Sequence, residues 1–463
     1  IEAQYRKADY ALAQVSFQDF NGKWLDAQGQ LHVAVHEGVI ESIVIEGNAR
    51  TDSDVILREL RLKPGDTFKQ NTFQEDLHRL HRLDFFETIE VIPTPGKVNP
   101  HHFALRLVVS EKKTADVGLN FSLNNRDGLL GGVHFTDPNF LGQGKYFNAK
   151  FQAGLDVLNL FGGNSQQSQR SFFGRVDFVE PFLLPDRTSL GGSLFSDRTP
   201  LFFNQAVLPE GLSTGDGLFQ TRTGASLRIG RPLFGDLYSP WHGDLSFTAE
   251  QVTLQDFAQK ARPELTFSQR RDASDTFFNL AGSLSFDNRD GVLDPHRGTY
   301  GSLRAQPVWG DGNYLKLAGN IATFVPILEP GLTLAMGLQG GALLGKHPIY
   351  EQFFGTGPST IRGWQENGSL AGSQYFVGSL EARFPVYQPV SGVVFTDMGN
   401  FFGSPLSRMD ELLNFKYGVG AGVRINTPLG LLRLDYGVRD FSRLHWNSWL
   451  DAGQLHFSIG HKF

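Results

Sequence analysis

Residues 353–364, with the sequence FFGTGPSTIRGW, form a glycine-rich segment that contains one charged side chain, Arg362. A guanidinium that folds into a place without water needs a carboxylate of matching planar geometry, because leaving it unpaired there is costly. The segment therefore predicts an inward-folded loop around residues 340–372, provided that acidic partners are in reach. The alternative is an exposed loop whose arginine pairs with nothing in particular, since surface ion pairs contribute little.

Two carboxylates follow in segments that alternate apolar and polar residues as β-strands do, Glu381 and Asp397. With a period of two, Glu381 lies on the face opposite Leu380, and Asp397 on the face opposite Met398. We therefore expect both acids on polar strand faces. If the loop turns inward, Arg362 can reach them and tie the loop to the wall of a barrel.

At this point the sequence resembles a family. The segment IRGW at 361–364 resembles the Val-Arg-Gly-Phe/Tyr signature at the tip of the inward sixth extracellular loop in the outer-membrane assembly and two-partner secretion superfamily. That superfamily includes the bacterial Bam barrel subunit and the chloroplast Toc channel. The segment FTDMG at 395–399 is similar to its Phe-x-Asp-x-Gly strand motif, whose aspartate faces the lumen and pairs with the loop arginine. The loop and wall residues implied by the resemblance are Ile361, Arg362, Gly363, Trp364, Glu381, Phe395, Asp397 and Gly399.

Composition narrows the class of protein. The 463 residues include no cysteine, which excludes disulfides, thiolate metal sites and a cysteine nucleophile. With 42 basic and 48 acidic residues, the chain lacks the basic character of nucleic-acid-binding proteins. No apolar run of 18 residues predicts a membrane helix, whereas a transmembrane barrel uses alternating segments of about ten residues.

The sequence pattern of residues 1–112 is that of a soluble α/β protein. Within 37–112 we expect a strand at 40–46, two helices, and strands at 85–92 and 103–109. Capping-box patterns predict that the helices open at Thr51 and Thr72.

This order resembles a POTRA domain, the periplasmic docking module of the same superfamily. Residues 37–112 are predicted to be one complete POTRA domain, and residues 1–36 the C-terminal part of a truncated one. The resemblance implies that unfolded outer-membrane or secreted polypeptides bind as added strands at a sheet edge, which uses backbone groups and designates no side chain.

From residue 113 to 463 alternation, glycine and phenylalanine dominate. Leu280, Gly282 and Leu284 alternate with small or polar residues, and Leu432 and Leu434 do the same. The apolar face of these strands would be the core of a soluble sandwich, or the lipid-facing surface of a membrane barrel. Proline pairs four residues apart, at 181–185, 326–330 and 385–389, mark short turns between long polar loops. Short turns alternating with long loops favour the barrel.

The C-terminal residues add a second signal for the barrel. Alternating hydrophobic residues that end in an aromatic residue resemble the sorting signal by which outer-membrane barrels are recognised for insertion. The residues of this predicted signal are Phe457, Ile459, Gly460 and Phe463. The alternative is an ordinary edge strand of a soluble domain.

No motif for catalysis or cofactor binding is found. Gly-x-Ser-x-Gly and His-Glu-x-x-His are absent, and His78 with His81 lack further ligands for a metal. We therefore expect no enzymatic activity, cofactor or metal.

The resemblance implies a 16-stranded antiparallel transmembrane β-barrel in the outer membrane of a Gram-negative-type bacterium, preceded by α+β POTRA domains in the periplasm. The implied function is the insertion of client β-barrels. Its partners would be client polypeptides, membrane lipid and accessory assembly subunits, but no nucleic acid. Passage of polypeptides across the outer membrane is the alternative, and residues 430–436 weakly resemble the cyanobacterial and chloroplast branch. A passive porin would explain the barrel but leave the POTRA unit and the arginine loop unexplained. An outer-membrane enzyme is a third, more distant alternative.

Overall fold

The structure is a computed structural model of the chain. It describes residues 1–17, 24–25, 28–124, 128–154, 171–201, 218–235, 239–256, 260–291, 294–328, 331–355, 359–364, 370–403, 414–427, 430–439 and 452–459. These residues form two compact units, one of residues 1–117 with 135–147 and one of residues 118–134 with 148–463. These units reflect spatial compactness and do not test the predicted domains 1–36, 37–112 and 113–463, whose boundaries stay a prediction.

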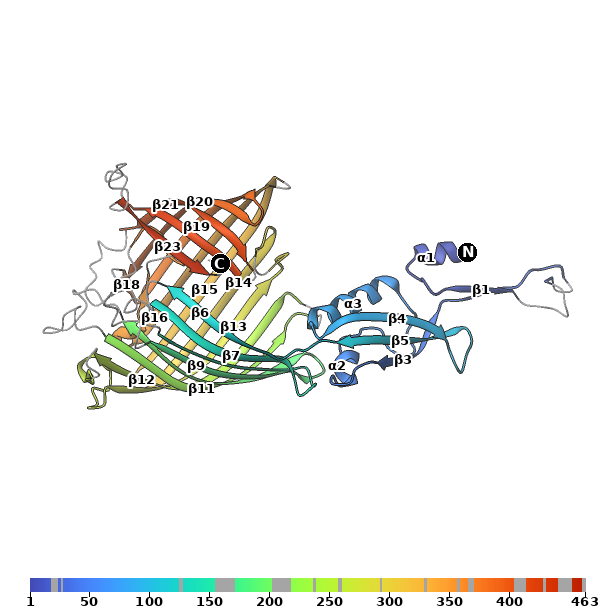
Figure 1. Cartoon of the computed structure of the whole chain (residues 1–463), viewed down its shortest axis with the longest axis horizontal. Helices are drawn as coiled ribbons and strands as arrows, with labels where there is room; N and C mark the ends of the chain where they lie inside the picture. The colour runs from blue at the N-terminus through green and yellow to red at the C-terminus, as the bar shows by residue number, and fades with distance from the viewer. Residues whose placement is uncertain are drawn as a thin grey trace. The chain divides into compact units, whose positions relative to one another are not determined.

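The first unit contains a small α/β sandwich (Figure 1). Its elements are α1 (Glu2–Lys7), β1 (Gln14–Phe17), β2 (Val33–His36), β3 (Val39–Glu46), α2 (Ser53–Leu57), α3 (Gln70–Leu83), β4 (Phe86–Pro95) and β5 (His102–Glu111). The sheet order is β3-β5-β4, with β3 parallel and β4 antiparallel to β5. Apolar residues of the helices, among them Ile56 and Leu80, are fully buried against Leu107 of the central strand.

The predicted helix starts are wrong. Helix α2 begins at Ser53 and α3 at Gln70, and no side-chain capping hydrogen bond is made at either N-terminus. Thr51 instead lies within the first unit as a partner of Asn139, whose Nδ2 donates to the Thr51 hydroxyl at 2.8 Å. Thr72 lies inside the first turn of α3. Tertiary contacts thus override a local sequence pattern.

The second unit contains most of a 16-stranded sheet that curves into a barrel (Figure 1), while residues 116–117, 135–140 and 145–147 of this sheet are counted in the first unit. Its strands and short 3-10 helices are β6 (Asp116–Asn124), β7 (Gly128–Phe140), β8 (Lys145–Gly154), β9 (Phe172–Leu184), β10 (Thr188–Leu201), β11 (Leu218–Pro232), β12 (Trp241–Asp256), η4 (Pro263–Leu265), β13 (Ser274–Asp287), β14 (Gly298–Gly310), β15 (Asn313–Leu328), β16 (Leu332–Lys346), η5 (Ile349–Glu351), β17 (Phe353–Phe354), β18 (Ala371–Gly372), β19 (Gln374–Tyr387), β20 (Val390–Phe402), β21 (Lys416–Thr427), β22 (Gly430–Val438) and β23 (Gly453–Ile459).

The sheet follows chain order from β6 to β23, with β16 next to β19 because β17 and β18 pair separately with each other. The predicted fold and the number of strands are confirmed. The sheet ends at β6 and β23, and in the described part of the chain no ladder joins these two strands. Among the described residues no helix is long and apolar enough to cross a membrane.

The two faces of this sheet are inverted relative to a soluble protein. Leu280, Leu338 and Leu434 are 40%, 44% and 46% exposed, whereas Asn279 and Asp435 on the other face are 2% and 1% exposed. A soluble sandwich would bury the leucines. The observed pattern is that of a barrel whose apolar face meets lipid and whose polar face lines the lumen.

The proline pairs mark short connections between paired antiparallel strands, β9 and β10 at 181–185 and β19 and β20 at 385–389, with the first proline of each pair near the end of the first strand. For the pair at 326–330, Pro326 lies near the end of β15, and Pro330 lies outside the described residues. The predicted terminal signal is covered only in part. Phe457 lies on β23, next to β22. Gly460 and Phe463, and the side chain of Ile459, lie outside the described residues.

The inverted burial predicts how arginine substitutions on β13 affect stability. Leu280→Arg places a charge on the exposed apolar face and should lower the free energy of unfolding by about 2–4 kcal/mol if it lies near the middle of the bilayer. Ser283→Arg places the same charge on the opposite face, between Asp244 and Arg304 of the neighbouring strands, and should cost much less. Urea unfolding in phospholipid vesicles measures both. Equal losses would contradict the assignment of the faces.

A second prediction concerns pH and the first unit. The backbone N–H of Asn99, together with those of Lys97 and Val98, donates to the Glu41 carboxylate and holds the pKa of Glu41 below its ordinary value. A lowered pKa in the folded state stabilises the turn at neutral pH, and this contribution is lost as the pH falls through the folded pKa. Glu41→Gln should therefore speed hydrogen exchange of residues 97–99 at pH 7. As the pH is lowered until Glu41 is protonated in the folded state, the difference between the two proteins, after correction for intrinsic exchange, should disappear; a constant difference over the whole pH series would contradict the assignment.

Candidate functional site

The inward loop leaves the wall at the end of β16 and returns at the start of β19. The helix η5 follows β16, and the two-stranded ladder β17–β18 then forms a neck in which Phe353 pairs with Gly372. The described residues 359–364 carry the tip. Ile361 is fully buried there, packed in one cluster with Val377 and Phe401 of the wall.

Arg362 at the tip has no exposed surface and binds Asp397 of β20 through two parallel hydrogen bonds. Its Nε donates to Oδ2 of Asp397 at 2.7 Å, and its Nη2 donates to Oδ1 at 2.9 Å. The backbone N–H of Arg362 also donates to Asp397, at 3.1 Å. This two-pronged geometry is the strongest arrangement available to an arginine and a carboxylate, and it fixes orientation as well as distance.

Two further carboxylates complete the site. Nη1 of Arg362 donates to Oε1 of Glu381 on β19 at 2.7 Å and lies 3.4 Å from Oδ2 of Asp435 on β22. Arg383 binds the other oxygen of Glu381 at 2.8 Å, and Arg424 binds Asp435 at 2.6 Å. We call this set, together with Arg433, which lies 3.3 Å from Asp435, the tip cluster. Its four guanidinium groups and three carboxylates come from the loop and from four strands, so it joins the loop to a whole section of the wall.

The other motif residues shape the space around Arg362. The guanidinium carbon of Arg362 lies 3.4 Å from the centre of the Phe395 ring, a cation–π contact. Gly363 has a φ of +94°, a conformation that L side chains rarely adopt. A Cβ on Gly418 of β21 would lie 1.8 Å from the carbonyl oxygen of Arg362, so the loop approaches this strand too closely for any side chain. At Gly399, a Cβ would lie 2.5 Å from the backbone of β19.

The tip also contacts the strand at the end of the sheet. The N–H of Gly363 donates to Nε2 of His456 on β23 at 2.9 Å, and His456 is only 1% exposed. Trp364 donates from its indole nitrogen to the carbonyl of Tyr417 on β21 at 2.9 Å. Trp364 stands where the family signature has Phe or Tyr, and its indole N–H makes a hydrogen bond that a phenylalanine could not make.

The structure thus brings together the loop residues, Glu381, Phe395 and Asp397 that the sequence analysis selected. It does not bring the C-terminal Phe457 into the cluster. Sequence reasoning missed Asp435, Arg424 and His456, which lie within the site. Strand alternation was a signal for each of them, because all three lie between apolar neighbours and so face the lumen. Alternation does not say, however, which of many lumen-facing residues meet.

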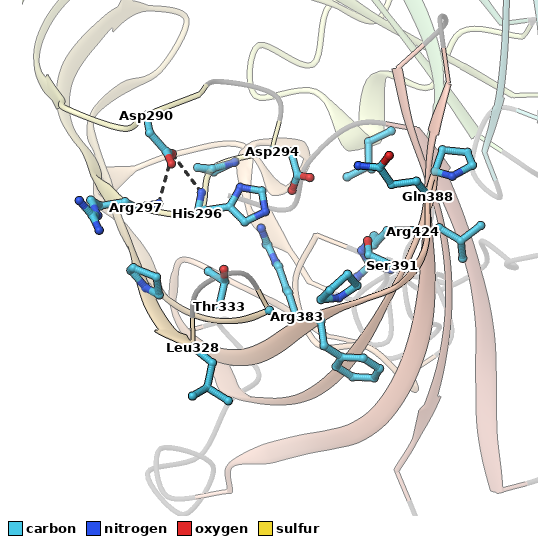
Figure 2. Close-up of a pocket in the computed structure, with 18 of the residues that line it drawn as sticks. Asp290, Asp294, His296, Arg297, Leu328, Thr333, Arg383, Gln388, Ser391 and Arg424 are labelled. Atoms are coloured by element: carbon cyan, nitrogen blue, oxygen red, sulfur yellow. Dashed lines mark hydrogen bonds between the residues drawn. The ribbon is translucent and has the colours of Figure 1, made fainter.

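A cavity of about 1000 Å³ adjoins the tip cluster, since Arg383, Arg424 and Arg433 line it. Figure 2 shows the Arg383 side chain pointing toward His296, and Asp290 accepting hydrogen bonds from the backbone of the same turn. Charged side chains of both signs line this cavity beside apolar ones such as Phe384 and Leu431. In the described ranges no group of three or more His, Asp or Glu could hold a metal ion.

Comparison with known proteins places this site in a family. The Omp85 superfamily domain matches residues 139–463, and the domain described as "Surface antigen variable number repeat", a POTRA domain, matches residues 39–125. Outer envelope protein 80 of Arabidopsis thaliana is 25% identical over 89% of the chain, and outer membrane protein assembly factor BamA of Nitratidesulfovibrio vulgaris is 25% identical over 92%. The chain spans about half the length of these relatives, 54% and 51% respectively.

A solved structure supports the fold. The crystal structure of BamA from Haemophilus ducreyi lacking POTRA domains 1–3 matches with a TM-score of 0.71, covering 99% of this chain and 92% of that one at 17% identity. At this identity the likeness concerns the fold alone. The expected location in the outer membrane, with the POTRA domain in the periplasm, is confirmed by the family. Since the superfamily domain covers well over half of the chain, the protein belongs to the Omp85 superfamily.

Proposed function

We propose that this chain folds β-barrel client proteins and inserts them into the outer membrane. The observation that carries the proposal is the tip cluster: one loop arginine is bound by carboxylates of β19, β20 and β22, while the next residue contacts β23 at the end of the sheet. A passive pore has no need for a loop tied to its last strands. The relatives of this chain include proteins named as outer membrane protein assembly factors.

The proposed mechanism uses backbone hydrogen bonds. Lipid cannot satisfy unpaired amides, so a client strand gains most by pairing with an edge that already lies in the membrane. The sheet of this chain ends at β6 and β23, which present such edges. The loop tip holds the β19–β23 section in one arrangement while a client pairs there. No covalent bond is made or broken in this scheme, and we accordingly propose that the protein is not an enzyme.

Partners follow from the same chemistry. In the first unit β3 and β4 are the edges of the three-stranded sheet, and they can accept an unfolded outer-membrane polypeptide as an added strand. The exposed leucines of the barrel bind membrane lipid. Accessory assembly subunits are proposed by analogy with the named assembly factors, and no cofactor is required.

Reconstitution tests the function against its rival. The whole chain in liposomes should raise the yield of a folded, protease-resistant porin added in urea, compared with empty liposomes. A soluble secreted polypeptide should stay outside the vesicles. Accumulation of that polypeptide inside, without porin insertion, would instead establish translocation.

Arg362→Ala should impair porin insertion strongly while the barrel stays in the membrane. Removing one partner of a buried ion pair costs about 3–5 kcal/mol. Here Asp397 loses the guanidinium that binds both of its oxygens, and Glu381 and Asp435 each lose one of their cations. Initial rates of porin folding, followed by the mobility shift of folded barrels on gels, measure the effect.

The matched control is Arg228→Ala, which removes an exposed arginine of β11 that lies 3.6 Å from Asp244 and outside the tip cluster. This variant should insert porin at the wild-type rate. Unchanged insertion by Arg362→Ala would reject the role of the loop arginine.

A further inference from the structure

The base of the inward loop carries a second buried charge cluster. The short helix η5, directly after β16, buries Tyr350 and Glu351, which are 3% and 5% exposed. A carboxylate buried to this degree is costly unless cations and hydrogen bonds compensate it.

Two cations of the wall compensate Glu351. Arg222 of β11 donates from Nη2 to one oxygen of Glu351, and Nζ of Lys316 on β15 donates to the other at 3.1 Å. Arg222 also lies 3.4 Å from Glu250 of β12. We call Arg222, Glu250, Lys316 and Glu351 the base cluster. Each of the two Glu351 oxygens thus has its own cationic partner.

Tyr350 adds a neutral contact beside it. Its hydroxyl donates to Asp275 at the start of β13, and Asp275 also accepts the backbone N–H groups of Phe267 and Ser268 at 2.8 and 2.7 Å. The ring of Tyr350 packs into an apolar cluster that includes Val252, Leu254 and Phe277, each with no exposed surface. This packing holds the base of the loop against β12 and β13.

We propose that Glu351 is a second positioning residue of the inward loop, which fixes where the loop leaves the wall so that Arg362 reaches its carboxylates. The base cluster uses β11, β12 and β15, whereas the tip cluster uses β19–β22. The two clusters therefore share no strand, and the loop ties separate parts of the sheet together. Only the consequence for porin insertion rests on the proposed function; the placement of the loop does not.

The neck of the loop connects the two ends. Phe353, two residues after Glu351, packs against the apolar clusters of both the base and the tip, and its ring lies 4.7 Å from that of Tyr375 on β19. If the base is released, more residues become free between the wall and the tip. The chain entropy lost on binding the tip then rises, and the tip cluster opens more often.

Trypsin reports this opening directly, because it cleaves after Arg362 and that residue has no exposed surface. With the whole chain in phospholipid vesicles, Glu351→Gln should speed cleavage after Arg362 about tenfold or more, the order expected from losing charge-assisted hydrogen bonds. Glu351→Asp, which keeps the charge, should restore much of the protection. Mass spectrometry of the fragments identifies the cleavage site.

The control is Glu264→Gln, a neutralisation of an exposed glutamate of η4 near Arg262 that leaves the base cluster intact. It should be as resistant as the wild type. Gel mobility without heating shows whether each variant is folded. If Glu351→Gln does not fold, Lys316→Gln is the substitute variant, because it leaves Glu351 bound to Arg222. Cleavage after Arg362 should then also be faster than in the wild type, but by a smaller factor.

Equal resistance of Glu351→Gln, Lys316→Gln and the control would overturn the proposal. A porin-insertion assay on the same samples separates the two levels of inference. Faster cleavage with reduced insertion supports both; faster cleavage with normal insertion supports the positioning role and counts against the part of the loop in assembly.

Discussion

The second unit depends on the compensation of one buried charge. Arg362 has no exposed surface, and its guanidinium is bound by carboxylates from three strands. A buried ion pair adds little net stability compared with apolar packing, but breaking it is expensive. Its main effect is therefore on conformation: other placements of the loop leave three carboxylates without their common cation. The tip of the inward loop is thereby held in one place.

This arrangement is possible because the barrel reverses the usual distribution of residues. Charged side chains would be excluded from the core of a soluble domain, whereas here the polar strand faces meet inside, as the 0% exposure of Glu381 and Asp397 shows. The loop backbone must also come close to the wall. Gly418 permits this, since a side chain there would overlap the carbonyl of Arg362. Charge and space are therefore specified together.

The sequence allowed the fold and the centre of the tip cluster to be predicted, because alternation identifies strand faces and the loop and strand motifs resemble those of a family. Three kinds of feature could not be predicted. Asp435 depends on how strands align across the sheet, and the partners of Glu351 lie 35 and 129 residues away in the sequence. The predicted helix start at Thr51 was wrong because a local pattern cannot register a tertiary contact such as that between Thr51 and Asn139. The start predicted at Thr72 lies two residues inside α3.

The positions of the two clusters suggest which end of the loop yields first. The base is attached to strands in the middle of the sheet, where β11 and β12 pair along their whole length, from Leu218 to Pro232. The tip is attached to β19–β22 and, through Gly363, to His456 on the final strand. Any movement of β23 relative to its neighbours therefore changes the surroundings of the tip directly, and those of the base only indirectly, through the neck at Phe353 and the intervening strands of the sheet. Because the base keeps its own ion pairs when the tip opens, the loop remains attached and close to its binding site, and the tip cluster can form again without a search through the unfolded chain.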